Sequence, residues 1–338
     1  MMAQVRTIAS IYPVAALALL LGCTQVNNRP SDEELADNSR DESPSYEWSE
    51  EQIRNAVNTA RAGRSLQPSE WPDGRKVAVS LSFDVDNETI SLRNGSVSVG
   101  ALSQGEYGAR VALGRVLDVL AEDNIPASFF IPSVSMMLNP GMVDAIKSHG
   151  IHEFGIHGWI HETNTQLPED VERRLVVQAI DYMEEMTGSR PVGYRAPSWN
   201  FSQNTLKIIQ DLGFLYDSSL MADDRPYELL AEGEPSGLVE LPVEWILDDA
   251  PLLNPRGSSY SSPREVLQVY KDEFDMAYEE GTMFLLTMHP HVIGHRSRIL
   301  ILRKLIEHIK QKDENVWFAT HQQVAEYVIE MSEDGESR

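Results

Sequence analysis

Short apolar segments alternate with segments of helical periodicity along most of the chain. From Arg75 onward, eight segments have the length and apolar composition of β-strands, namely 76–83, 126–132, 152–158, 191–198, 214–219, 238–245, 282–290 and 316–320. Between several of them, apolar residues recur at helical spacing, as in 109–122, 169–186 and 202–212. Such alternation over about 250 residues predicts an α/β fold with parallel strands and outer helices, either a barrel or a doubly wound sheet.

Residues that can carry charge follow the ends of several predicted strands. They are Asp84, Asp86, His157, His161, Arg195, Asp217 and His289. In both α/β architectures the active site forms at the carboxyl ends of the strands. We therefore expect these side chains to converge on one active-site opening at the carboxyl ends of the strands.

Two of these residues, His157 and His161, belong to the segment HGWIHE. They would share one face if this segment begins a helical turn. Together with a carboxylate from another strand end they would form a His-His-Asp set with open positions, the pattern of catalytic rather than structural zinc. The spacing HxxxH alone is not specific, because two such histidines often have only a structural role.

The segment DVD supplies the carboxylates. Asp84 and Asp86 are two positions apart, so in a strand they point to the same side, whereas a turn after the strand would separate them. One can then bind a metal while the other remains a base. The same segment is also compatible with a solvated strand end or an acidic calcium-binding loop.

Five motifs occur in the order SFDVD, HGWIH, YRAPSW, YDSS and LLTMH. In this order they resemble the motifs of the polysaccharide deacetylases, which are carbohydrate esterase family 4 and carry the NodB-homology domain. The resemblance extends from about Trp71 to Tyr327 and is closer to the branch of peptidoglycan-deacetylase-like and allantoinase-like proteins. It implies a distorted (β/α) barrel and the removal of acyl groups from amides by a metal-dependent hydrolase.

The resemblance also implies a role for each motif. Asp86, His157 and His161 would hold a divalent metal, usually Zn²⁺. Asp84 would be the catalytic base, and Arg195 would pair with it.

The acid and the substrate-binding residues follow in the same way. His289 would be the general acid, and Asp217 would orient it. Trp159, Trp199 and Trp245 lie beside motif residues in the sequence, so they either stack on a sugar ring or fill the core.

Two positions depart from the common family pattern. Val85 separates two aspartates that are usually adjacent, and Gly158 replaces a usual Ser or Thr. Amide hydrolysis is therefore better supported than sugar binding. The loop 248–263 is either a lid that closes over the substrate or a surface loop without a role in binding.

The composition narrows the class of protein. The chain has 338 residues, of which 42% are hydrophobic, enough for a globular core. Its 28 basic and 52 acidic residues give a formal net charge of -24, so the chain lacks the basic surface that a phosphate backbone requires. We expect no nucleic-acid partner.

The first residues predict export. Arg6 precedes an apolar run at 14–21 that is too short to span a membrane. The following Gly22 and Cys23 complete a segment that resembles the lipobox of bacterial lipoproteins, in which Cys23 becomes the lipidated N-terminus. Cys23 is the only cysteine, so we expect a membrane-anchored lipoprotein, at the outer membrane and facing the periplasm if the host is Gram-negative.

These observations predict four segments and one function. The segments are a signal peptide at 1–22, an acidic disordered tether at 23–46, a catalytic domain at 47–332 and a disordered tail at 333–338. The predicted function is N-deacetylation of an extracytoplasmic amino-sugar polysaccharide such as peptidoglycan. Two alternatives remain open: hydrolysis of a small cyclic amide or imide, and a catalytically inactive lipoprotein that binds glycans.

Overall fold

The structure is a computed structural model that describes residues 44–253 and 261–336. The chain divides into two compact units, 1–49 and 50–338. In the first unit the described residues contain a 3-10 turn, Ser45–Glu47. The predicted signal peptide, Cys23 and nearly all of the predicted tether lie outside the described residues.

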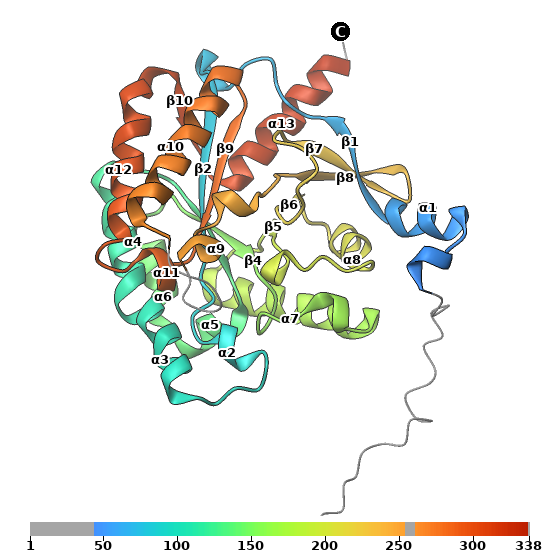
Figure 1. Ribbon diagram of the computed structural model, residues 1–338, viewed down its shortest axis with the longest axis horizontal. Coiled ribbons are helices and arrows are strands. Elements are labelled where there is room, and N and C mark those ends of the chain that lie inside the picture. Colours follow the sequence, from blue (N-terminus) through green and yellow to red (C-terminus); the bar gives the residue numbers. More distant parts are fainter. Residues whose placement is uncertain (1–43, 254–260, 337–338) are drawn as a thin grey trace, which may run out of the picture. The chain divides into compact units, whose positions relative to one another are not determined.

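The second unit contains one mixed sheet of ten strands (Figure 1). Their bounds are β1 Ala60–Ser65, β2 Val77–Asp84, β3 Ser128–Ile131, β4 Glu153–Ile156, β5 Gly193–Tyr194, β6 Tyr216–Asp217, β7 Tyr227–Ala231, β8 Glu234–Glu240, β9 Met283–Met288 and β10 Val316–Phe318. The strand order is β1-β7-β8-β6-β5-β4-β3-β2-β10, and β9 pairs with β2. β7 pairs antiparallel with both β1 and β8, whereas all other pairs of neighbouring strands are parallel.

The sheet curls into a half-barrel with helices packed against it, which confirms the predicted distorted (β/α) barrel. The helices are α1 Glu50–Asn58, α2 Thr89–Leu92, α3 Val99–Tyr107, α4 Leu113–Glu122, α5 Ser133–Leu138, α6 Gly141–Lys147, α7 Glu169–Thr187, α8 Thr205–Asp211, α9 Asp249–Leu253, α10 Pro263–Glu280, α11 Pro290–Ile293, α12 Ile299–Ile309 and α13 His321–Glu336. The three helices predicted from periodicity correspond to α4, α7 and α8.

Two predicted boundaries need comment. α13 continues to Glu336, so the predicted disordered tail at 333–338 begins too early. The buried residues Val324 and Val328 anchor this helix, and no proline interrupts the segment that follows them. In the predicted loop 248–263, residues 249–253 form α9, whereas 254–260 lie outside the described residues.

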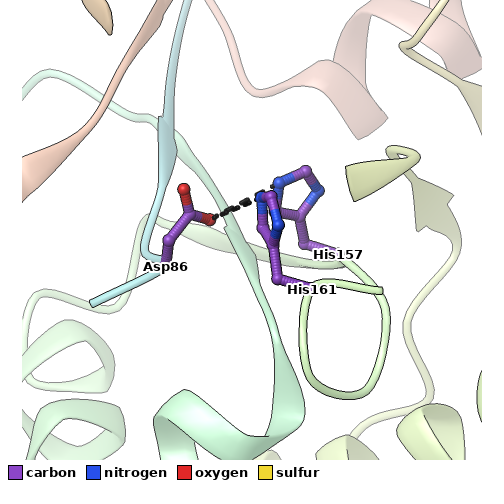
Figure 2. A group of neighbouring side chains, drawn as sticks. All are labelled: Asp86, His157 and His161. Carbon is purple, nitrogen blue, oxygen red and sulfur yellow. Dashed lines mark ion pairs between the residues drawn. The ribbon is translucent and has the colours of Figure 1, made fainter. Parts of the chain in front are cut away.

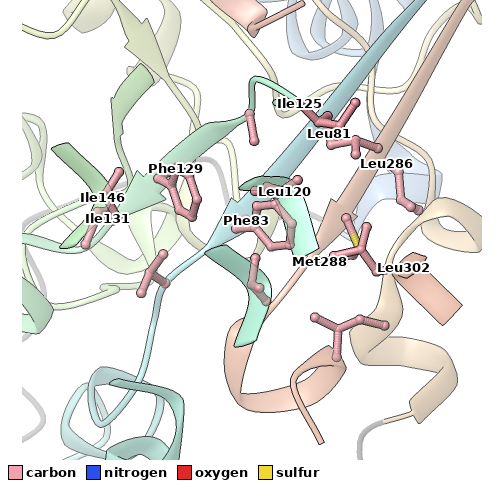
Figure 3. Packing of buried hydrophobic residues seen from close by; sticks show 14 of the residues in the cluster. Leu81, Phe83, Leu120, Ile125, Phe129, Ile131, Ile146, Leu286, Met288 and Leu302 are labelled. Atoms are coloured by element: carbon pink, nitrogen blue, oxygen red, sulfur yellow. The ribbon is translucent and has the colours of Figure 1, made fainter. Parts of the chain in front are cut away.

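β2 shows how alternation along one strand separates the core from the site. Leu81 and Phe83 belong to the main hydrophobic cluster, where Figure 3 shows them beside residues of α4, β3 and β9. The alternating residues Ser80, Ser82 and Asp84 are also buried but make polar contacts. Because side chains alternate along a strand, one face of β2 packs against helices while the other lines a polar interior.

Candidate metal centre and active site

Asp86, His157 and His161 face one another just beyond the ends of β2 and β4 (Figure 2). The Asp86 Oδ1 lies 3.5 Å from His157 Nε2 and 3.6 Å from His161 Nε2. Two ligands at about 2.1 Å from one tetrahedral ion are themselves about 3.4 Å apart, so these separations suit a shared ion. The sequence-predicted ligand set is therefore brought together.

The donor set also fits a metal on chemical grounds. Asp86 has 0% exposure, yet neither of its carboxylate oxygens accepts a hydrogen bond from any described residue. Burial raises the pKa of this carboxyl group, because the charged form has lost its water. A buried carboxylate without donors is costly, and a bound cation would remove that cost.

The histidine segment does not begin the helical turn that would place both imidazoles on one face. Gly158 and His161 adopt the left-handed backbone conformation, with φ of 75° and 63°. The Glu162 carboxylate accepts hydrogen bonds from the backbone N–H groups of Trp159 at 3.0 Å and Ile160 at 2.8 Å. A tight loop held by Glu162 therefore brings the two imidazoles together, with ring centroids 5.0 Å apart.

Contacts at the second ring nitrogens differ between the two histidines. His157 donates from Nδ1 to the carbonyl oxygen of Arg195 at 2.9 Å, which leaves the Nε2 lone pair facing Asp86. The Nδ1 of His161 lies 2.8 Å from Arg93 Nη1, and arginine can only donate. In this contact His161 accepts at Nδ1 and carries its proton on Nε2, so binding a metal through Nε2 requires that the Arg93 guanidinium give up its contact with Nδ1.

Asp84 is held by Arg195 as the resemblance implied. Arg195 donates from Nη1 to Asp84 Oδ1 at 2.7 Å, and both side chains are buried. Burial alone would raise the pKa of Asp84, but Arg195, together with His157 and His289, lowers it below its ordinary value. The carboxyl group is thus kept in the form that can accept a proton.

Our prediction that Asp217 orients His289 was wrong. His289 donates from Nδ1 to Asp249 Oδ1 at 2.8 Å, and its backbone N–H donates to the same oxygen at 3.0 Å. Asp217 instead accepts hydrogen bonds from the backbone N–H and hydroxyl of Ser219, and Glu240 lies beside it. Asp249 lies 40 residues before His289, so no local spacing marked it as the partner.

Two carboxylates lie beside Nδ1 of His289, and a third, from Asp86, places its Oδ2 3.6 Å from Nε2. The Asp248 Oδ1 lies 3.4 Å from its Nδ1, in addition to the contact with Asp249. Burial would lower the pKa of His289, but the charges of Asp248, Asp249 and Asp86 outweigh burial and raise it well above its ordinary value. Asp248, Asp249 and His289 also form a second group with possible metal ligands, although the Asp249 contact has the length of a hydrogen bond.

A cavity of about 380 Å³ joins these groups. Its lining includes the metal group together with Asp84, Arg93, Trp199, Trp245, Asp248 and His289. The rings of Trp199 and Trp245 lie with centroids 4.2 Å apart, and Trp245 is 47% exposed. These two tryptophans are placed where a substrate could stack on them.

Trp159 does not line this cavity. Its ring packs edge-on against Tyr182 of α7, which agrees with the packing role of the two roles left open for Trp159. His291 and His295 also lie outside the lining, and His295 stacks on Tyr107. His152 packs edge-on against Phe129.

Comparisons with known proteins agree with this geometry. A family model described as polysaccharide deacetylase matches residues 106–216. A solved structure from Mycobacterium smegmatis, assigned to the polysaccharide deacetylases, is 35% identical with a TM-score of 0.74, covering 80% of this chain and 96% of that chain. The chain belongs to the polysaccharide deacetylase family.

Two other relatives extend the comparison of this deacetylase. A peptidoglycan deacetylase of Helicobacter pylori is 29% identical over 283 residues, which are 75% of this chain and 96% of that protein. The solved structure of the allantoinase Puue is 24% identical with a TM-score of 0.68, covering 78% of this chain and 93% of that chain, and shows the fold alone.

Membership gives the reaction class. The chain is a hydrolase of carbon–nitrogen bonds other than peptide bonds, in a family whose deacetylases depend on metals. Within the described ranges, no helix is long and apolar enough to cross a membrane.

Proposed function

We propose that this deacetylase removes N-acetyl groups from an extracytoplasmic amino-sugar polysaccharide such as peptidoglycan. The observation that carries the proposal is the pair Asp84 and His289, whose surroundings shift their pKa values in opposite directions beside one cluster of metal ligands. A carboxylate kept charged and an imidazole kept protonated are the base and acid that amide hydrolysis needs. The relation to the Helicobacter pylori enzyme supports the substrate class.

Each group has a defined task in this mechanism. Asp84 takes a proton from the attacking water, while Arg195 fixes its orientation and charge. His289, oriented by Asp249, gives its proton to the leaving nitrogen. A divalent ion held by Asp86, His157 and His161 would supply Lewis acidity to the amide carbonyl and the water. Acetate and a free amine result.

The metal is proposed to be zinc. Two imidazole nitrogens and one carboxylate oxygen form the donor set of open catalytic zinc sites. Trp199 and Trp245 are proposed to contact the sugar, because both rings border the same cavity and Trp245 is 47% exposed.

Metal content and acetate release test the proposal together. The protein beginning at Thr24 should hold about one zinc per chain and release acetate from chito-oligosaccharides or peptidoglycan. His157→Ala/His161→Ala should lose both. Metal without acetate release, combined with opening of hydantoin or imide rings, would instead establish a cyclic amide hydrolase. Glycan binding that is unchanged in Asp84→Asn, without any hydrolysis by the wild type, would establish a binding protein.

We also propose the predicted segments: signal peptide 1–22, lipidation at Cys23, tether 23–46 and catalytic domain from residue 47. The tether of about 20 residues would let a membrane-anchored enzyme reach tens of ångströms into the cell wall. Cys23→Ala should move the protein from the membrane fraction to the soluble fraction, and mass spectrometry should find diacylated Cys23 only in the wild type. An equal distribution of both proteins would contradict the anchor.

A further inference from the structure

His321 contacts Arg195, the partner of the proposed catalytic base Asp84, although no motif of the sequence marked it. It begins α13 directly after β10, and its side chain has 0% exposure. Its Nδ1 lies 2.7 Å from Ser80 Oγ on the polar face of β2, and its Nε2 lies 3.1 Å from Arg195 Nη2. It does not line the cavity that holds the metal group.

The hydrogen bonds of Arg195 account for all five of its N–H groups. The Nε–H donates to the carbonyl oxygen of Ser218, and Nη1 donates to Ser82 Oγ and Asp84 Oδ1. Nη2 donates to Ser218 Oγ and His321 Nε2. Because every donor of this buried guanidinium has one acceptor, the loss of any acceptor leaves a charged N–H unpaired.

The same contacts define the protonation state and the tautomer of His321. Arginine can only donate, so His321 Nε2 must be unprotonated. The neutral ring then carries its proton on Nδ1 and donates it to Ser80 Oγ, whose own proton goes to the carbonyl oxygen of Ala319 at 3.1 Å. Burial and the charge of Arg195 lower the pKa of His321 well below its ordinary value, which agrees with a neutral ring.

We propose that His321 is a positioning residue that fixes Arg195, and through it Asp84, by accepting one N–H of the guanidinium. The proposal rests on the proposed role of Asp84 as the base. Phe130 completes the arrangement, since its ring lies 4.1 Å from the guanidinium carbon and packs edge-on against the imidazole of His321. His321 therefore acts on the reaction only through geometry.

Two variants of His321 test this role in the full-length chain purified in detergent. His321→Leu keeps an apolar filling but removes the acceptor, whereas His321→Gln keeps a carbonyl oxygen that can accept from Arg195. We expect His321→Leu to lower kcat about 10- to 100-fold with KM within about twofold, because small displacements of a catalytic group are costly. His321→Gln should recover most of kcat.

The controls separate positioning from general damage. His152→Leu makes the same chemical change at a histidine without a contact to Arg195 and should keep kcat within about twofold. Zinc content should stay at that of the wild type in His321→Leu, because the three ligands are untouched. A kcat unchanged in His321→Leu, or equally low in His321→Gln at wild-type zinc content, would overturn the proposal.

Nuclear magnetic resonance of ¹⁵N-histidine-labelled wild type tests the contact between His321 and Arg195 without an activity assay. We expect an unprotonated Nε2 and a protonated Nδ1 at His321, assigned by comparison with His321→Gln. The opposite tautomer or an imidazolium would overturn the proposal even if both variants fold poorly. A wild type that releases no acetate from any substrate would instead fail the proposed function, so the two failures are distinguishable.

Discussion

Asp84 and Asp86 lie two positions apart, yet their neighbours give them different chemistry. Asp84 accepts a hydrogen bond from Arg195, which keeps it ionised, whereas Asp86 has no donor among the described residues and faces two imidazoles. A carboxylate with an arginine partner suits proton transfer, and one without donors suits a metal. The division of roles follows from the partners and not from the residue type.

The partner of His289 gives a prediction at the same scale. Asp249→Asn should lower kcat about 10- to 100-fold, because the amide keeps an acceptor but loses the charge that favours the imidazolium. Asp217→Asn should change kcat by less than about threefold, since Asp217 has no contact with His289. Steady-state kinetics of acetate release checks both, and a larger loss in Asp217→Asn would restore the original assignment.

Asp217 should instead affect stability as a function of pH. Burial raises its pKa from 3.8 to about 6. The folded state therefore holds this proton more tightly than the unfolded chain, and the stability it contributes is present below about pH 4 and lost as pH rises to about 6. In urea unfolding, the free energy of unfolding of Asp217→Asn relative to wild type should rise by up to about 3 kcal/mol between pH 4 and pH 7. A difference that does not vary with pH would contradict the buried, protonated carboxyl group.

At the scale of elements, the loop after β4 decides where the metal ligands point. Gly158 has φ of 75°, and a Cβ there would lie 2.8 Å from Pro197 Cγ and 3.0 Å from the Glu162 carboxyl group. Glycine is therefore required both by the backbone conformation and by the space. The close packing of the loop against Pro197 joins the second motif to the third.

Substitution of Gly158 should affect metal binding more than substitution of a glycine in a turn that is strained but not crowded. Gly158→Ala should cost about 2–4 kcal/mol of unfolding free energy and weaken zinc binding about tenfold or more, because the loop must shift. Gly150→Ala is the matched control: its φ is 69°, but no atom lies within 4 Å of an added Cβ. It should cost about 1–2 kcal/mol and leave zinc affinity unchanged. Equal zinc affinities in the two variants would argue against this account of the loop.

At the scale of the whole molecule, parallel pairing brings together residues that are far apart in the sequence. β2 pairs with β3 and β9, and β3 pairs with β4, so the ends of these strands lie at one edge of the sheet. A metal shared by Asp86 and the two histidines would link the ends of β2 and β4 in the folded chain only. Binding to the folded state alone stabilises it by mass action.

Zinc should therefore raise the melting temperature, and a chelator should reverse the change. At a free zinc concentration about 100 times the Kd, the gain is about 2.7 kcal/mol. Asp86→Asn should abolish the gain, whereas Asp249→Asn should retain it if the ion binds at Asp86, His157 and His161. Calorimetry with and without zinc measures this, and loss of the gain only in Asp249→Asn would move the ion to the group of Asp248, Asp249 and His289.

The sequence by itself determined eight of the ten strands, the helices α4, α7 and α8, and the residues of the candidate metal group, whereas β1, β7 and the long helices α10 and α13 were not predicted. Alternation along β2 and the helical spacing in α7 are local patterns, and five ordered motifs placed Asp84, His157, Arg195 and His289 at strand ends. Such features depend on neighbouring positions in the chain, so they are visible before folding.

Tertiary structure alone decided the partners. Asp249 rather than Asp217 contacts His289, His321 contacts Arg195 across 126 residues, and Trp159 packs against α7 away from the cavity. No local spacing encodes these pairs, because each depends on which strand ends and helix starts meet in the half-barrel. The conformation of the histidine loop was also set there, since Glu162 and Pro197 enforce a left-handed turn where the spacing suggested a helix.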